Sequence, residues 1–239
     1  MRVFMKKCTK CGIEKDEAEF SKHDKNKDGL QFWCKLCFNS YRYELRQQCF
    51  ELFNSKCQRC GETNTDVLTI NHIKPPSSDI YNGLKRGGVR LYKQILDNPN
   101  LVKYFTLLCA NCNMIDYYEK SGYYNIHTNY QTLWFRKKKE KICEMWNNKC
   151  FHCFRTFPTE LLSLNHINGG GTKEMYERSN GYKNSLFIIA PTDELINRID
   201  SGELELTCFN CNCNRTEYSK WIKQGMAQKK SLNKSEQLI

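Results

Sequence analysis

The sequence predicts an α+β chain built from small metal-stabilised modules, in which one N-terminal module precedes two tandem copies of a strand–return–helix unit. Three observations lead to this prediction. Twelve of the 15 cysteines form six Cys-x-x-Cys pairs. The heptad LLCANCN at 107–113 recurs as LTCFNCN at 206–212. No segment approaches the apolar length that a membrane-spanning helix needs, so we expect no membrane association.

The cysteine spacing indicates structural zinc. A tetrahedral Zn²⁺ site takes two thiolates from one tight turn and two from another, whereas disulfide frameworks scatter their cysteines. Taken in sequence order, the six pairs make three Cys₄ sites. The predicted ligands are Cys8, Cys11, Cys34 and Cys37; Cys57, Cys60, Cys109 and Cys112; and Cys150, Cys153, Cys208 and Cys211. A redox role is disfavoured because no thioredoxin-like βαβ pattern surrounds the pairs.

Charge and compartment agree with an intracellular, anion-binding protein. The formal charge of +11 falls to about +5 when each Zn(Cys)₄ centre contributes −2. Basic residues gather in RKKKEK (136–141) and at 220–234, and nucleic-acid phosphate is the usual partner of such surfaces. Solvated lysines that aid solubility explain either run almost as well. The start, MRVFMKKCTK, has no apolar run after its lysines, so we expect a reducing, cytoplasmic location.

The N-terminal module is expected to span residues 1–42. Its two cysteine pairs enclose a short polar segment with a turn signal at Asp28-Gly29. Phe20, Phe32 and Trp33 are the candidates for a miniature core. So small a fragment buries too little apolar surface to fold without its metal.

The remainder is an internal repeat, which we divide into residues 43–130, residues 131–222 and a basic tail at 223–239. The first repeat reads FNSKCQRC, LTINHI and LLCANCN, and the second reads WNNKCFHC, LSLNHI and LTCFNCN. Cys57 and His72 are 15 residues apart, and Cys150 and His166 are 16 apart.

Each repeat has the same predicted elements in the same order. A helix precedes the first cysteine pair, with Phe50 and Phe53, or Cys143 and Trp146, facing inward. A strand of period two follows, in which Leu68, Ile70 and His72 share one face, as do Leu162, Leu164 and His166. The insertion then holds a short helix, stopped by Pro99 in one repeat and capped by Thr192 in the other. The second cysteine pair opens a final helix.

A histidine that ends the first strand, followed by LLCxxCN at the start of a helix, resembles the HNH (ββα-metal) endonuclease superfamily. The likeness is greatest to phage HNH proteins and to phage recombination endonuclease VII. LTINHI, LLCANCN, LSLNHINGGG and LTCFNCN carry it, and CTKCG with DGLQFWCKLC resembles a zinc module of such proteins. The resemblance covers most of residues 1–218. It implies a metal-dependent hydrolase of DNA phosphodiester bonds.

The resemblance assigns roles to residues of both repeats. His72 and His166 would be the catalytic general bases. Tentative ligands of a catalytic Mg²⁺ or Mn²⁺ would be Asn71, Asn113, Asp116, Asn165 and Asn212. The residue before the histidine is usually aspartate or histidine in active members, whereas both repeats have asparagine, and a neutral amide binds a hard cation more weakly.

The two repeats then diverge in charge. Asp116 lies three residues after Asn113 and could restore a carboxylate, which favours the first repeat as the active site. Arg215 lies three residues after Asn212 and would repel a cation. Glu174 and Glu177 are substitute ligands whose positions the sequence does not give, and the glycines after Asn168 allow close backbone approach to an anion.

Structural roles compete with these assignments. Either histidine could serve the fold alone, and Asn113 and Asn212 could cap their helices. Asp116 could be an ordinary surface acid. We expect Cys49, Cys143 and Cys213 in the core, His152 exposed between its cysteines, and the lysines of 136–141 on an exposed helix face.

Two functions follow from the sequence. The first is a DNA endonuclease or nickase of HNH type, with the first repeat favoured for cleavage. Endonuclease VII-like enzymes act as dimers on branched DNA, so the tandem chain could be an internal pseudo-dimer. The alternative is a catalytically inactive, zinc-built protein that binds nucleic acid or serves as a scaffold, which two asparagines in place of carboxylates favour.

Overall fold

The computed structural model describes residues 5–74, 83–84, 87–121, 130–180 and 185–214. The described chain is mixed α+β, and its strands form small two-stranded sheets. It separates into two compact bodies. The first contains the described parts of residues 1–58 and 70–107, and the second contains those of 59–69 and 108–215. The division runs through the β-hairpin of the first repeat.

The N-terminal module consists of two hairpins that lead into a long helix. Its elements are β1 (Met5–Lys7), β2 (Glu14–Asp16), η1 (Glu17–Glu19), β3 (Phe20–Lys22), β4 (Leu30–Cys34) and α1 (Lys35–Glu51). Cys8, Phe20 and Cys34 form its buried core, and Trp33 packs against them. Phe32 was expected there but is 58% exposed, and its ring centroid lies 5.8 Å from the ammonium of Lys6. Helix α1 runs without a break across residue 42.

The first repeat follows the predicted order of elements. They are the end of α1, η2 (Thr65–Val67), β5 (Leu68–His72), α2 (Gly88–Asp97), η4 (Pro99–Tyr104), β6 (Phe105–Cys109) and α3 (Ala110–Lys120). Phe50 and Phe53 are buried as predicted, and Cys49 joins them. The α2 helix ends at Asp97, next to the residue that precedes Pro99, in agreement with the prediction. Pro99 itself occupies the first position of η4, where its missing N–H costs nothing.

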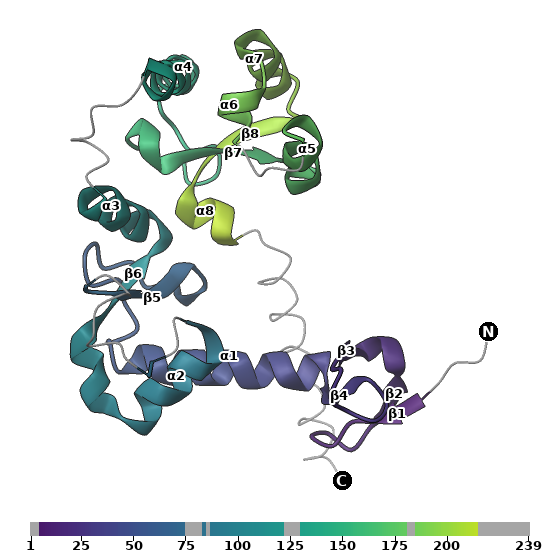
Figure 1. Cartoon of the computed structure of the whole chain (residues 1–239). Coiled ribbons are helices and arrows are strands. Elements are labelled where there is room, and N and C mark those ends of the chain that lie inside the picture. The colour runs from purple at the N-terminus through teal and green to yellow at the C-terminus, as the bar shows by residue number, and fades with distance from the viewer. Residues whose placement is uncertain (1–4, 75–82, 85–86, 122–129, 181–184, 215–239) are drawn as a thin grey trace, which may run out of the picture. The chain divides into compact units, whose positions relative to one another are not determined.

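The second repeat repeats this order with a longer insertion. Its elements are α4 (Tyr130–Met145), η5 (Thr159–Leu161), β7 (Leu162–His166), α5 (Gly171–Arg178), α6 (Leu186–Ile189), α7 (Thr192–Asp200), β8 (Leu204–Cys208) and α8 (Phe209–Asn214). In Figure 1, α4, α6 and α7 gather on one side of the β7–β8 hairpin, and α8 continues from its end. Thr192 begins α7 rather than capping it, since Pro191 is the N-cap residue.

One apolar core holds the second repeat together. Strands β7 and β8 are antiparallel and pair Leu162 with Cys208 and His166 with Leu204. The even-numbered strand residues face helices α4, α6 and α7, and Leu162, Leu204 and Leu206 are at most 1% exposed there. Cys143 is buried and Trp146 packs against this core, as predicted. The odd-numbered residues lie on the opposite face, towards α8.

The two repeats share their backbone in detail. Gln58 N–H donates to Leu107 O, and Phe151 N–H donates to Leu206 O, both at 2.8 Å. Each helix before a cysteine pair is also followed by two residues of positive φ, Asn54 and Ser55 in one repeat and Asn147 and Asn148 in the other. Matching backbone bonds therefore occur at matching positions of the two repeats.

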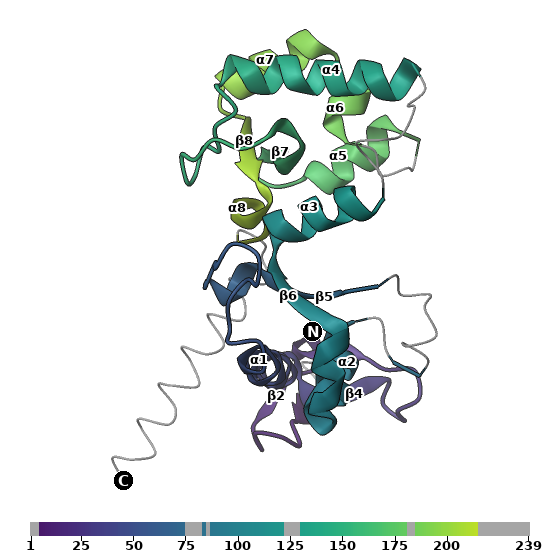
Figure 2. The ribbon, with the colours of Figure 1, turned by 90° about the vertical axis from the view of Figure 1, so that its left-hand side faces the viewer.

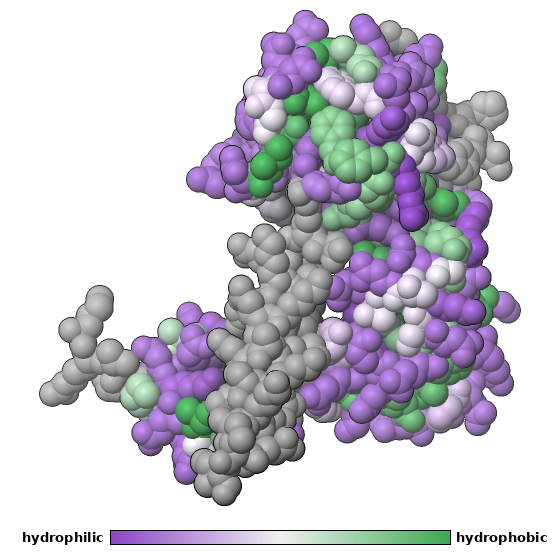
Figure 3. Space-filling view, turned by 180° about the vertical axis from the view of Figure 1, so that it is seen from behind, coloured by the Kyte–Doolittle hydropathy of each residue, from purple (hydrophilic) through white to green (hydrophobic). Residues whose placement is uncertain are grey.

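The visible surface of the described chain is largely hydrophilic, with apolar residues in scattered spots (Figure 3). Among the described residues, no helix combines the length and apolar character needed to cross a membrane.

Candidate functional site

The six cysteine pairs come together as three groups of four, combined as the sequence predicts. Within each group the candidate ligand sulfurs lie within 4.8 Å of one another. The Sγ atoms of Cys60 and Cys109 are 3.7 Å apart. A tetrahedral zinc with Zn–S bonds of about 2.3 Å places its sulfurs roughly 3.8 Å apart, so the groups fit structural zinc.

Backbone N–H groups in the cysteine turns donate hydrogen bonds to cysteine sulfurs, which favours the thiolate form that binds a metal. Cys37 N–H donates to Cys34 Sγ and Cys112 N–H to Cys109 Sγ, each at 3.5 Å. Burial opposes ionisation, yet backbone N–H groups lower the pKa of Cys8 to about 6 and of Cys150 to about 7. Burial and neighbouring sulfurs raise the pKa of Cys211. Four thiolates in one group therefore need a cation to coexist.

His166, a predicted general base, belongs to a network of charged side chains. Its Nε2 lies 2.5 Å from Glu174 Oε2, and Arg198 donates to both oxygens of Glu174, at 2.6 and 2.8 Å. Hydrogen bonds from Arg198, and then from His166, hold the pKa of the Glu174 carboxyl at about 2. Because an ionised carboxylate only accepts, Nε2 of His166 carries the proton. The basic lone pair of the neutral ring is then on Nδ1.

The ring of His166 leaves no room for a side chain at position 171, which is a glycine. A Cβ added there would lie 2.9 Å from Cε1 of His166 and closer still to Nδ1. Gly171 is the first residue of α5, which also carries Glu174. Gly171, the third glycine of NGGG, thus allows α5 to approach His166. The sequence had instead suggested that these glycines allow the backbone to approach an anion. Glu177, the other proposed substitute ligand, is exposed and pairs with Lys173 at 3.7 Å.

Asn165 lies on the opposite face of the hairpin, towards α8. Its Nδ2 donates to Oε1 of Glu205 at 2.8 Å, and Glu205 is its cross-strand partner. Oε2 of Glu205 lies 2.9 Å from Nε2 of His152. Glu205 is only 5% exposed. His152 was expected to be exposed; its side chain is 28% exposed because the cysteine turn holds it against Glu205.

Asn212 reaches the same face from α8. Its Nδ2 donates to Ser163 Oγ at 3.4 Å, and that hydroxyl donates to Thr207 O at 3.2 Å. The structure therefore brings Asn165 and Asn212 to one face, beside a buried carboxylate, and places His166 at the end of the same strand on the other face. Amide, hydroxyl and carboxylate oxygens are the donors that Mg²⁺ and Mn²⁺ prefer, so this donor set fits a hard divalent cation. Arg215 lies outside the described residues.

In the first repeat, Asn71 and His72 end β5 in the first body. The His72 ring packs edge-on against Phe105, with ring centroids 5.0 Å apart. Phe105 and Thr106 occupy the positions that Leu204 and Glu205 have in the second repeat. Thr106 Oγ1 donates to Gln58 Oε1 at 2.6 Å. The carboxylate of the second repeat thus has no equivalent on β6.

Asp116 of the first repeat is engaged by a cation of its own helix. Lys120 Nζ lies 2.7 Å from its Oδ2, an i,i+4 pair on α3 in the second body. One turn along, Arg59 makes a bidentate pair with Glu119 at 2.7 and 2.9 Å. Arg59 holds the place that His152 has in the second repeat.

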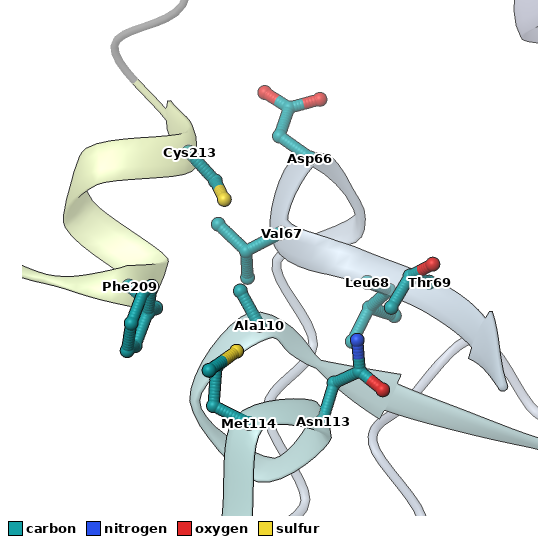
Figure 4. A pocket seen from close by; sticks show the side chains of 9 residues that line it. All are labelled: Asp66, Val67, Leu68, Thr69, Ala110, Asn113, Met114, Phe209 and Cys213. Carbon is teal, nitrogen blue, oxygen red and sulfur yellow. The ribbon is translucent and has the colours of Figure 1, made fainter. Parts of the chain in front are cut away.

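Asn113 borders a pocket of about 310 Å³ in the second body. Asp66 and Thr69 are its other polar side chains, and the remainder of the lining is apolar apart from Cys213 (Figure 4). Asn113 does not cap α3, whose N-cap residue is Cys109. Cys213 is exposed rather than buried in a core as predicted, and it lines this pocket with its sulfur directed toward Val67.

The starts of α3 and α8 are joined by a reciprocal pair of hydrogen bonds. Asn111 N–H donates to Asn210 Oδ1 at 2.9 Å, and Asn210 N–H donates to Asn111 Oδ1 at 3.1 Å. Each asparagine is the second residue of its helix, where the backbone N–H has no partner within the helix. The helices lie side by side in both ribbon views (Figures 1 and 2). Each repeat therefore satisfies a helix end of the other.

The basic stretch of α4 is less exposed than predicted. Lys138 is 7% exposed and its ammonium donates to the carbonyl of Ala190. Lys139 Nζ donates to Glu160 O at 3.4 Å. Lys137 and Lys141 remain exposed. The two inward lysines bind backbone carbonyls across the core because α4 packs on α6 and η5.

Comparison of the chain with protein-family models, with curated proteins and with solved structures gave no match.

Proposed function

We propose that this protein is a metal-dependent DNA endonuclease or nickase of HNH type. The observation that carries the proposal is the arrangement of the second repeat. A Cys₄ group lies at the base of the hairpin, oxygen donors of Asn165, Asn212 and Glu205 lie on the face towards α8, and a histidine bound to a carboxylate ends the strand. The sequence resemblance to the HNH superfamily supports the same function.

Each group has a part in hydrolysis. His166, held by Glu174 through Nε2–H, would take a proton from water on Nδ1 as the water oxygen attacks phosphorus. The bond from phosphorus to the leaving oxygen then breaks, and that oxygen takes up a proton from solvent. Asn165, Asn212 and Glu205 would hold Mg²⁺ or Mn²⁺, which stabilises negative charge on the phosphate when it is bound. The cysteine groups would hold structural zinc.

Sequence and contacts favour different repeats for cleavage. Asp116 favours the first repeat in the sequence, but its carboxylate pairs with Lys120. Buried Glu205 and the Glu174–His166 pair favour the second repeat. The preference for the first repeat stays a prediction, and one experiment separates the two.

The test is a cleavage assay on supercoiled plasmid and on a four-way DNA junction, with zinc-loaded protein and added Mg²⁺ or Mn²⁺. His72→Ala and His166→Ala are compared with His23→Ala, which removes a histidine of the N-terminal module. Loss of nicking in only one repeat's variant identifies the active repeat, and loss in both indicates cooperating repeats. Omission of the added metal should abolish cleavage.

The second candidate function is a catalytically inactive nucleic-acid binder. The pairing of Asp116 with Lys120 and the neutral residue before each histidine favour it. A wild-type protein that shifts both DNA substrates in a gel but cuts neither, with either metal, would establish this function and exclude the nuclease.

A further inference from the structure

We propose that Glu205 supplies the negative charge of a divalent-cation site in the second repeat, in place of the carboxylate that Asn165 lacks. The inference rests on the proposed function, because the cation is the one that hydrolysis would use. It assigns the charge to β8, the second strand of the hairpin, rather than to the residue before the histidine.

The first argument is register. Antiparallel pairing places Asn165 directly opposite Glu205, and paired side chains project from the same face of a sheet. Their hydrogen bond of 2.8 Å holds the carboxylate directly against the amide. A charge missing from one strand is therefore present on the next, at the same point of the face.

The second argument is the orientation of the amide. An asparagine can present either its oxygen or its NH₂ group to a ligand, and only the oxygen binds a cation. Nδ2 of Asn165 donates to Glu205, which assigns Oδ1 as the remaining polar atom of the side chain. Glu205 is thus a positioning residue for Asn165 as well as a source of charge.

The third argument is burial. A carboxylate that is 5% exposed is costly in an apolar protein interior unless a cation or hydrogen bonds compensate it. Its contacts with Asn165 and His152 supply hydrogen bonds to the carboxylate, and both are side chains found in metal sites. The other strand residues on this face, Ser163 and Thr207, add hydroxyl oxygens rather than apolar groups.

The experiment measures Mn²⁺ binding to the zinc-loaded full chain without DNA, from the electron paramagnetic resonance signal of free Mn²⁺. Glu205→Gln keeps the shape and the acceptor for Asn165 but removes the charge. We expect Mn²⁺ affinity to fall by about 10- to 100-fold. Glu144→Gln, which removes an exposed charge from α4, should leave it unchanged. Zinc content and far-ultraviolet circular dichroism establish that the variants are folded.

A double variant separates charge from structure. In N165D/E205Q the hydrogen bond between the two positions is kept with donor and acceptor exchanged, and the charge moves to β7. We expect Mn²⁺ affinity to return to within a few-fold of the wild type. In the first repeat, Thr106→Glu places a carboxylate at the equivalent position and should strengthen Mn²⁺ binding there.

The outcomes distinguish this inference from the proposed function. Unchanged Mn²⁺ affinity in Glu205→Gln, or a wild type that binds no Mn²⁺, overturns the inference. If binding depends on Glu205 but no DNA is cut, the cation site stands and the nuclease function fails. If DNA is cut while Glu205→Gln binds Mn²⁺ normally, the function stands and the charge comes from elsewhere.

Discussion

The two repeats have matching backbones but different surroundings for their histidines. His166 is bound to a carboxylate that Arg198 also holds, whereas His72 packs against the ring of Phe105. On the other face, Glu205 bonds to Asn165, while Thr106 takes the equivalent place in the first repeat. The two repeats therefore share the same histidine, asparagine and cysteine positions, but different side chains surround them. The charged partners come from positions that no motif includes.

The largest expected effect is the loss of one zinc site. Cys150→Ser and Cys57→Ser should each lower the zinc content from three to two per chain, since structural zinc contributes roughly 10–16 kcal/mol in small domains. Trp146 packs on the core of the second repeat, and the first repeat contains no tryptophan. Tryptophan emission should therefore shift to the red in Cys150→Ser only.

Cys49→Ser is the matched control, because Cys49 is buried but belongs to none of the three groups. It should retain three zincs by atomic absorption. A red shift in Cys57→Ser as well would mean that the repeats unfold together, and three zincs in Cys150→Ser would contradict the assignment of that site.

A smaller effect is expected from filling the space beside His166. Gly171→Ala places a methyl group against the ring and should destabilise the protein by about 1–3 kcal/mol, as overpacking does. It should also remove any cleavage that depends on His166. Chemical denaturation and the plasmid assay measure the two effects.

Gly169→Ala is the comparison for that variant. Gly169 has a φ of 78° but no atom within 4 Å of an added Cβ, so only backbone strain of about 1 kcal/mol is expected there. Equal loss of cleavage in both variants would show that the loop, and not the His166 ring, is responsible.

The smallest effect concerns the contact that the repeats share. Asn111→Ala and Asn210→Ala each remove one side-chain acceptor from a helix end and should cost about 0.5–2 kcal/mol. A double-mutant cycle by urea denaturation should give a coupling energy of about 0.5–3 kcal/mol. Additive effects, within about 0.3 kcal/mol, would show that the two bonds act independently.

The sequence was sufficient for the metal groups and the order of elements. Cysteine spacing predicted the three groups of four, which could hold metal ions, because a tetrahedral site needs two close pairs. Strand alternation predicted that Leu162, Leu164 and His166 share one face. Burial of Cys49 and Cys143 was also predicted. Whether the catalytic assignments of His72, Asn71 and Asp116 are right stays a prediction.

Among the partners in the candidate site, Glu174 was suggested by the sequence, but Glu205 and Arg198 were not. Glu205 matters through its register with Asn165, which depends on a connection of 37 residues between the two strands. Arg198 lies on α7 and reaches His166 only after that helix has packed. The one available signal was the polar residue at every second position of LELTC, which indicates a second, polar face on β8.

The asparagine pair has a consequence for how the two halves can change. In a symmetric homodimer, one gene sets both sides of the contact, so every substitution appears twice. Here Asn111 and Asn210 are encoded separately, yet each bond depends on both residues, so selection on this contact still acts on the halves jointly. Positions far from this contact can change in one repeat without a matching change in the other. One half can then carry glutamate at 205 while the other carries threonine at 106, a division of labour that a homodimer cannot inherit.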